Sequence, residues 1–344
     1  MNLVTGATGF VGRYVVEKLR AAGRPVRLFD LRTPAWLDES TLKAGQLEFF
    51  RGDVTYRPDV ARALAGVKQV YHLAAQLLMA GDDRRMHQVN AEGTRTVLDE
   101  AWKVGVEKVV YTSTGMLYPP SQGQPTREDT HPDPSGAYGR TKVEAEAVCR
   151  SYQSRGLPLT ILRPLFVLGP GRLGVMHLLF HRLKRGRPLY LVGNGDNRFH
   201  MIHVSDLAEA CLLAMDSDVT GVYNVGAANP QSVRTLFEGL RAHAGTGSAI
   251  RPIPVSLVRL GIQTLSSLHI APIAPEQQAV AYQDRVLDIT QAQELLGFVP
   301  RYSDLQTMIE AYEWYKTVDS TVSDQPADWP DGGIFKYRLV DRLF

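Results

Sequence analysis

The sequence predicts an α/β protein whose core is a doubly wound parallel sheet, with a smaller C-terminal subdomain that binds the substrate. Short apolar segments alternate with longer segments of helical periodicity through the first half of the chain. Strands are expected near residues 3–4, 25–30, 47–50, 67–73, 109–113 and 159–163, with helices over 84–104 and 137–155. Ligands of such sheets bind at the carboxyl ends of the strands, so functional residues are sought there.

The first strand runs directly into a glycine-rich turn. Residues 5–12 read T-G-A-T-G-F-V-G, and the apolar positions that follow recur at helical spacing. Glycine lets the backbone approach a pyrophosphate closely, and the helix N-terminus offers N–H groups and a positive dipole end. This strand–turn–helix pattern predicts a Rossmann-type dinucleotide site formed by Gly6, Thr8, Gly9, Phe10, Val11 and Gly12.

An acidic residue stands at the distance that such a site requires. Asp30 ends the second apolar strand, where its carboxylate would accept hydrogen bonds from the adenosine ribose and repel a 2′-phosphate. This favours NAD over NADP. Arg32 lies two residues later, and a guanidinium there could pair with a 2′-phosphate, so NADP stays open as a cofactor.

The composition is that of an ordinary globular protein. The chain has 344 residues, 44% hydrophobic and 22% charged, and its net charge of +2 gives no electrostatic reason to expect a nucleic-acid partner. Cys149 and Cys211 lie in apolar helical patterns and are expected to be buried thiols of a reducing compartment. No apolar run approaches the roughly 20 residues of a membrane span. The chain opens on its first core strand, so we expect a cytoplasmic protein with no membrane partner.

A tyrosine and a lysine stand four residues apart in the segment Y-G-R-T-K at residues 138–142. This spacing places both side chains on one face of the predicted helix. A phenol titrates at about 10, and a neighbouring ammonium favours its ionised form. Tyr138 is therefore a candidate general acid/base that exchanges a proton with a substrate hydroxyl while hydride moves to or from a nicotinamide. Lys142 is the candidate for lowering the pKa of Tyr138 and for holding the nicotinamide ribose.

Together these motifs resemble those of the extended short-chain dehydrogenases/reductases of the NAD-dependent epimerase/dehydratase family. The resemblance covers roughly residues 1–316, and it implies an enzyme that uses NAD. Beyond the glycine turn and the Tyr138/Lys142 pair, it rests on Gly52-Asp53-Val54, His72-Leu73-Ala74-Ala75, Tyr111-Thr112-Ser113-Thr114, Leu162-Arg163-Pro164, residues 202–208 (I-H-V-S-D-L-A) and residues 296–300 (L-G-F-V-P).

The resemblance also implies roles for individual residues. Thr114, four residues before Tyr118, takes the position of the family's catalytic Ser or Thr, and its hydroxyl would polarise the substrate oxygen. Ser113 is the alternative for this role. Asn90 is expected to hold a helix against the sheet rather than to take part in catalysis. The further cofactor contacts are Asp53 and Val54 at the adenine, Leu73, Ala74 and Ala75 along the cofactor, and Thr112 and Pro164.

The substrate half departs from the nucleotide-sugar members of the family. These usually carry an asparagine where this chain has Phe166, and an arginine where it has Phe199, with Arg198 displaced by one position. An apolar pair is unfavourable for a diphosphate and favourable for a hydrophobic substrate, and the apolar positions within 257–268 suggest the same. The pattern is closer to members that act on steroids, flavonoids and other apolar alcohols or ketones. Alternatively, both phenylalanines belong to the core and phosphates are held by Arg172, Arg182, Arg187 or Arg285.

We therefore expect an NAD-dependent oxidoreductase that interconverts a secondary alcohol and a ketone on a largely apolar small-molecule substrate, with Thr114, Phe166 and Phe199 contacting that substrate. The alternatives are a nucleotide-sugar epimerase or dehydratase with tightly held NAD, and a cofactor-binding regulator without turnover. No metal site is expected, because His177 and His181 stand at helical spacing without a third ligand.

The resemblance further implies a homodimer in which the helices over 84–104 and 137–155 of two subunits pack together. The expected division of the chain is a Rossmann domain over 1–165, a mostly substrate-binding subdomain over 166–316 and a C-terminal tail over 317–344.

Overall fold

The computed structural model describes residues 1–33, 47–77, 82–172, 174, 176–260 and 282–317. The expected tail from residue 318 onward and the apolar positions from 261 to 268 lie outside the described residues.

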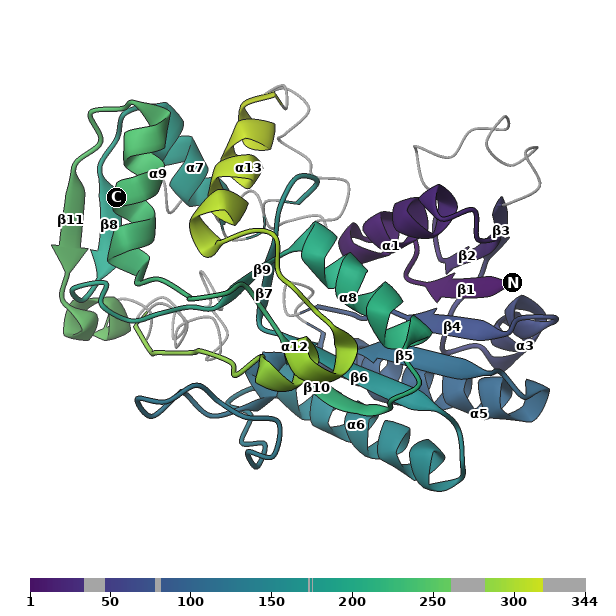
Figure 1. The fold of residues 1–344 in the computed structure, drawn as a ribbon. Helices are drawn as coiled ribbons and strands as arrows, with labels where there is room; N and C mark the ends of the chain where they lie inside the picture. The colour runs from purple at the N-terminus through teal and green to yellow at the C-terminus, as the bar shows by residue number, and fades with distance from the viewer. Residues whose placement is uncertain (34–46, 78–81, 173, 175, 261–281, 318–344) are drawn as a thin grey trace.

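Seven parallel strands form one sheet in the order β10–β6–β5–β4–β1–β2–β3 (Figure 1). The order reverses between β1 and β4, which creates the crevice where doubly wound sheets bind ligands. The strands lie close to the predicted segments, and the predicted fold class is confirmed. They are β1 (Asn2–Thr5), β2 (Val26–Asp30), β3 (Leu47–Arg51), β4 (Gln69–His72), β5 (Lys108–Thr112), β6 (Leu159–Pro164) and β10 (Gly221–Val225).

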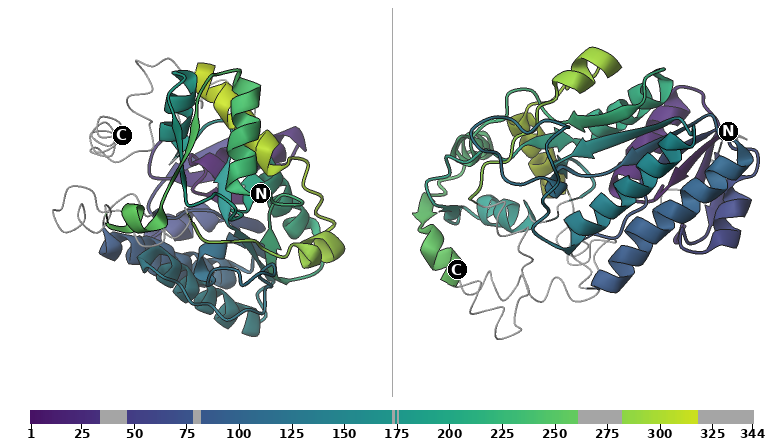
Figure 2. Two further views of the ribbon diagram at one scale, coloured as in Figure 1. Left: turned by 90° about the vertical axis from the view of Figure 1, so that its left-hand side faces the viewer. Right: turned by 90° about the horizontal axis from the view of Figure 1, so that it is seen from below.

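Helices cover both faces of this sheet. On one face α1 (Phe10–Ala21) packs against α8 (Val204–Asp216), and on the other α5 (Thr94–Val104) packs against α3 (Arg57–Leu64) and α6 (Ala137–Ser154). The view from below in Figure 2 shows α5 and α6 side by side. Apolar side chains alternate between the two faces along each strand, so one buried cluster forms on each side of the sheet.

The helix predicted over 84–104 is not uniform. It consists of α4 (Asp83–His87), a π-helical turn (Gln88–Gly93) and α5 in direct succession. A π turn inserts a residue into the helix and is frequent at functional sites. Here the turn contains Asn90, which the site described below uses.

The second half of the chain forms a smaller unit beside the carboxyl ends of the sheet strands (Figure 1). Two short parallel strand pairs join β7 to β9 and β8 to β11. A third buried apolar cluster lies among these elements and the helices around them. The elements are β7 (Phe166–Leu168), α7 (Met176–Lys184), β8 (Leu189–Val192), β9 (Met201–His203), α9 (Val233–Ala244), β11 (Ile250–Ile253) and α13 (Asp304–Thr317). The helix α12 (Thr290–Leu296) packs instead against α8 and β10, and its Ala292 and Leu296 belong to a buried cluster of the large sheet.

Candidate active site

The residues expected to bind the cofactor gather along one edge of the sheet. Because the strands are parallel, their carboxyl ends meet at that edge. The glycine turn follows β1, Asp30 ends β2, Leu73 follows β4, Thr112 ends β5 and Pro164 ends β6. The structure therefore brings together residues that are far apart in the sequence.

The glycine turn is packed backbone against backbone. Gly6 has a left-handed φ of +67°, and a Cβ there would lie 2.8 Å from the backbone nitrogen of Ala74. A Cβ on Gly12 would lie 2.1 Å from the carbonyl oxygen of Gly6. Only glycine fits these positions, and the first turn of α1 begins directly behind them at Phe10. The turn thus has the shape and the N–H groups that a pyrophosphate requires.

Asp30 is held at the rim of this turn. One carboxylate oxygen accepts a hydrogen bond from the backbone N–H of Thr8 (2.9 Å), and the other accepts one from that of Leu31 (2.7 Å). These bonds fix the carboxylate where the ribose of a dinucleotide would lie. Arg32 is exposed just beyond the strand.

On the adenine side, Asp53 is already engaged by neighbouring groups. Its carboxylate accepts hydrogen bonds from the Thr55 backbone (2.9 Å) and hydroxyl (2.8 Å), and it forms an ion pair with Arg85 (2.7 Å). Burial opposes ionisation of Asp53, but these hydrogen bonds outweigh it and lower its pKa. Val54 is buried beside the π turn, where it contacts Gly93. Arg85 could not be predicted as a site residue, because its partner Asp53 lies 32 positions away in the sequence.

A chain of hydrogen bonds connects the strand ends beneath the cofactor edge. The Thr5 hydroxyl contacts His72 Nδ1 at 2.7 Å, and His72 Nε2 contacts the Thr94 hydroxyl at 2.9 Å. The Thr94 hydroxyl donates to the carbonyl oxygen of Asn90 (2.6 Å), so His72 Nε2 must carry the proton that it donates to Thr94. Thr5 also accepts from the backbone N–H of Ala74 (3.2 Å). Burial lowers the pKa of His72 to about 3, so the ring is neutral.

Asn90 connects the loop after β4 to α6, the helix that carries Tyr138 and Lys142. Its amide oxygen accepts from the Gln76 N–H (2.8 Å), and its Nδ2 donates to the Gln76 carbonyl (3.0 Å) and to the Thr141 hydroxyl of α6 (3.0 Å). These three bonds agree with the holding role that the resemblance implies for Asn90.

The tyrosine and lysine of the predicted catalytic motif lie in the first turns of α6, which begins at Ala137. Tyr138 is half-buried and Lys142 is buried. Lys142 Nζ donates to the Tyr111 hydroxyl at 2.9 Å and to the Thr112 carbonyl at 2.8 Å. Burial lowers the pKa of Lys142 to about 8, against the opposing influence of Cys149 and Glu146.

Thr114 lies directly after β5, beside this helix. Its hydroxyl oxygen accepts a hydrogen bond from the Met116 N–H (3.1 Å) and caps the short 3₁₀ turn Gly115–Leu117. Because the oxygen is the acceptor in that bond, the hydroxyl proton can still be donated to a substrate oxygen. Ser113, the alternative, is also buried.

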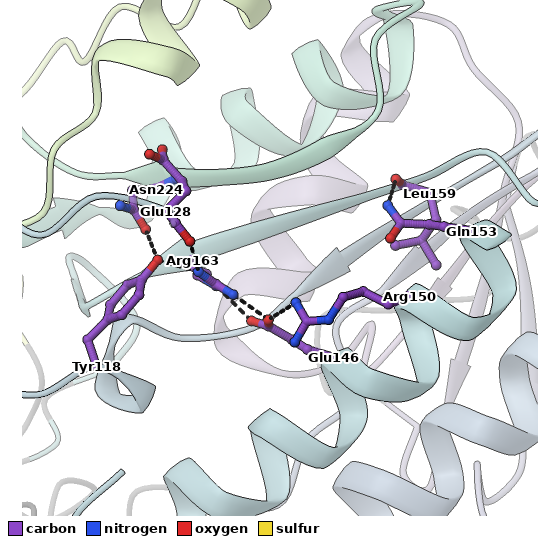
Figure 3. A network of polar contacts seen from close by, with 8 residues as sticks. All are labelled: Tyr118, Glu128, Glu146, Arg150, Gln153, Leu159, Arg163 and Asn224. Atoms are coloured by element: carbon purple, nitrogen blue, oxygen red, sulfur yellow. Dashed lines mark hydrogen bonds and ion pairs between the residues drawn. The ribbon is translucent and has the colours of Figure 1, made fainter. Parts of the chain in front are cut away.

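A buried ion pair anchors α6 two turns beyond Tyr138. Figure 3 shows Arg163 of β6 between Glu146 and Tyr118. The Arg163 guanidinium binds Glu146 through two nitrogens, one of them at 2.8 Å, and both side chains are almost inaccessible to solvent. Burial opposes ionisation of Glu146, but Arg163 outweighs it and lowers the pKa of Glu146. The Tyr118 hydroxyl continues the network to Asn224 of β10 at 3.1 Å.

The two phenylalanines that distinguish the substrate half contact each other. The ring centroids of Phe166 and Phe199 are 5.2 Å apart. Phe199 is 4% exposed and Phe166 is partly buried. Both belong to the apolar cluster that also contains Met116, two residues after Thr114, and Val143, next to Lys142. The neighbouring Arg198 forms an ion pair with Asp284 at 2.7 Å.

The described part of the chain contains neither a cluster of metal ligands nor a membrane-spanning helix. No group of three or more His, Cys, Asp or Glu side chains there could hold a metal ion. No helix of the described ranges is long and apolar enough to cross a membrane. His177 and His181 instead lie with their rings 5.8 Å apart on α7, where His181 contacts the Tyr315 hydroxyl of α13 at 3.2 Å.

Comparisons with known proteins agree with this arrangement. Residues 2–226 match the model of the NAD dependent epimerase/dehydratase family. The chain is 37% identical over 315 residues to the protein y4nG of Sinorhizobium fredii, which covers 91% of this chain and 78% of that protein. It is 29% identical over 351 residues to a 3-beta-hydroxysteroid dehydrogenase of Mycolicibacterium neoaurum, which covers 94% of each.

The fold is also found among solved structures. The UDP-glucose 4-epimerase of Thermotoga maritima superimposes with a TM-score of 0.75 at 26% identity, covering 92% of this chain and 99% of that one. The family model matches well over half of this chain. The chain therefore belongs to the NAD dependent epimerase/dehydratase family, and it is an NAD-dependent enzyme of the extended short-chain dehydrogenase/reductase type.

Proposed function

We propose that this protein is an NAD-dependent dehydrogenase that interconverts a secondary alcohol and a ketone on a largely apolar substrate such as a sterol. The observation on which this proposal depends is the contact between Phe166 and Phe199 in an apolar cluster that also contains Met116 and Val143, which are close in sequence to Thr114 and Lys142. A 3-beta-hydroxysteroid dehydrogenase that aligns with 94% of the chain supports it.

In this proposal three side chains carry out the proton transfer. Tyr138 takes the proton of the substrate hydroxyl, or returns it to the ketone. Lys142 favours the ionised form of Tyr138 through its charge and binds the nicotinamide ribose. Thr114 donates its hydroxyl proton to the substrate oxygen and orients it. The bound nicotinamide supplies the hydride acceptor or donor.

The pairing of the arginine next to Phe199 also favours an apolar substrate. A diphosphate requires cationic or N–H donors. The guanidinium of Arg198, the arginine next to Phe199, is matched by the carboxylate of Asp284 through bonds to two of its nitrogens. An aromatic pair beside a neutralised arginine is a poor anion site. Phe166, the less buried ring of the pair, is the one that is suited to contact a hydrophobic ring system.

A binding and turnover screen tests this proposal. The protein is saturated with NAD⁺ and its thermal unfolding is measured with 3β-hydroxysterols, with aryl carbinols, and with UDP, dTDP and GDP sugars. Stabilisation by apolar alcohols, followed by NADH formation at 340 nm, is the expected result. Stabilisation by a nucleoside diphosphate, without stabilisation by any apolar alcohol, would contradict it.

The second candidate function is nucleotide-sugar epimerisation or dehydration. It is favoured by the superposition on a UDP-glucose 4-epimerase over 92% of the chain. In such an enzyme the keto form is transient, so conversion of the sugar would occur without net NADH release and NAD would stay bound through purification. The screen above separates the two candidates.

We further propose that the protein is a cytoplasmic homodimer. The dimer contact is assigned to α5 and α6, where Trp102 and Val104 are exposed and the Arg155 guanidinium lies 4.0 Å above the Trp102 ring. Light scattering tests the dimer, and a Trp102→Glu variant, which introduces a negative charge at this contact, should shift the protein to monomer.

The two cysteines are free and buried, as suits a reducing compartment. Residues 166–316 are proposed to form most of the substrate pocket and 1–165 the cofactor domain, with residues beyond 316 as a tail.

A further inference from the structure

A second tyrosine lies beside the catalytic lysine. Tyr111 is in β5 and is 1% exposed. Its hydroxyl accepts a hydrogen bond from Lys142 Nζ at 2.9 Å, and Nζ lies 4.5 Å from the centre of its ring. Tyr111 therefore contacts the ammonium both with its oxygen and with its aromatic face.

These contacts restrict the direction of the ammonium. A lysine ammonium has three N–H donors and no acceptor, and it sits at the end of a flexible side chain. Two of the donors are directed to the Tyr111 hydroxyl and the Thr112 carbonyl. With two donors fixed, the tetrahedral geometry of the nitrogen determines where the third one points.

Tyr111 is suited to orient the lysine and not to exchange protons with it. Burial raises the pKa of Tyr111 well above its usual value, so the phenol stays neutral. Its ring is stacked on the neutral ring of His72 at 5.5 Å, with an interplanar angle of 30°. His72 is itself fixed by Thr5 and Thr94. Tyr111 thus has little freedom to move with Lys142.

We infer that Tyr111 is a positioning residue, which holds the Lys142 ammonium so that its third donor addresses the nicotinamide ribose. The inference rests on the proposed role of Lys142 as the ribose contact. Tyr111 lies outside the proposed set of Thr114, Tyr138 and Lys142. Its role would be exerted through Lys142 and not by contact with the substrate.

A double-mutant cycle on cofactor affinity tests this inference without any substrate. The Kd of NAD⁺ is measured by calorimetry for the wild type, Tyr111→Phe, Lys142→Met and the double variant. Loss of one hydrogen bond to a charged group predicts about tenfold weaker NAD⁺ binding for Tyr111→Phe. In the Lys142→Met background, Tyr111→Phe should change the Kd less than about twofold, because a residue that acts through Lys142 has no effect once Lys142 is gone.

Tyr71→Phe is the matched control. Tyr71 is buried in the neighbouring strand β4, but it pairs in register with Val110 and therefore points to the opposite face of the sheet from Tyr111. The same loss of one buried oxygen there should leave the Kd of NAD⁺ unchanged. If Lys142→Met does not fold, an NAD⁺ analogue whose nicotinamide ribose lacks both hydroxyls replaces it, and Tyr111→Phe should not weaken binding of that analogue.

Two outcomes would overturn the inference about Tyr111 and leave the proposed ribose contact of Lys142 intact. Equal weakening by Tyr111→Phe in both backgrounds would show a general structural role, and an unchanged Kd in Tyr111→Phe would show that Lys142 is positioned without it. If Lys142→Met itself leaves NAD⁺ binding unchanged, the proposed ribose contact is wrong and the inference falls with it. The three results are distinguishable within one set of measurements.

Discussion

The cofactor edge of the sheet and the apolar cluster around Phe166 bury opposite kinds of side chain within one site. At the edge, Thr5, His72 and Lys142 are buried polar groups, each with hydrogen-bond partners. In the cluster, Phe166 and Phe199 contact each other among other apolar residues. Hydrogen bonds fix direction, whereas apolar contacts fix only volume and shape. The first region is therefore suited to determine the reaction and the second to determine which substrate undergoes it.

The largest expected effect comes from removing the proposed acid/base of the polar region. Tyr138→Phe should lower kcat by about 10²–10⁴-fold, because no group remains to exchange the substrate proton. NAD⁺ affinity should stay unchanged. Steady-state kinetics and calorimetry measure the two effects. Tyr152→Phe, on the same helix but with its hydroxyl bonded to Asp99, is the control and should retain kcat. Retention of wild-type kcat by Tyr138→Phe would exclude the mechanism.

The next largest effect is expected on stability, from breaking the buried ion pair between Arg163 and Glu146 that anchors α6. Arg163→Met leaves the buried Glu146 carboxylate without its main partner, and loss of one member of a buried pair costs about 3–5 kcal/mol. Urea denaturation should show this decrease in the free energy of unfolding. The double variant Arg163→Met/Glu146→Leu removes both charges and should recover part of it. An Arg163→Met protein as stable as the wild type would argue against an anchoring role.

Substitution in the apolar region should change substrate preference while sparing the cofactor. Phe166→Ala is expected to lower kcat/KM for a sterol by about tenfold, the effect of losing a few apolar contacts. The KM for NAD⁺ should not change. Phe237→Ala is the matched control, since Phe237 of α9 is also partly buried against the same cluster. Equal losses in both variants would indicate that Phe166 serves only the core.

The buried histidine of the polar region predicts acid sensitivity. Burial holds the pKa of His72 at about 3, against a usual value of 6.5. Below pH 6.5 the unfolded chain takes up a proton that the folded chain does not, so the folded state loses stability as pH falls from 6.5 towards 3. The slope is about 1.4 kcal/mol per pH unit for one such group. Denaturation curves at several pH values measure it, and His72→Asn should flatten the dependence by this amount. An unchanged slope in that variant would place the acid sensitivity elsewhere.

The fold was predictable because it depends on local patterns. Gly6, Gly12 and Asp30 have characteristic spacings, and the apolar strands are short and regularly separated by helices. Residues that act through distant partners were not predictable. Tyr111 stands within an apolar strand, where its sequence context is that of any core residue. Arg163 and Glu146 come into contact only when β6 packs against α6. The spacing of Tyr138, Lys142 and Glu146, four residues apart each time, was the one signal that Glu146 shares the face of the catalytic pair.

The edge strand β10 makes the large sheet depend on both halves of the chain. It comes from the second half of the chain, yet it pairs with β6 along its whole length, from Gly221 to Val225. A fragment that ends after β6 would leave one edge of this fully buried strand unpaired, because only its β5 side would keep a partner. An unpaired apolar edge promotes aggregation. The ribosome must therefore release more than 220 residues before the sheet is complete. A nascent chain of this protein is expected to need protection until then, and fragments cut at residue 165 are expected to express poorly.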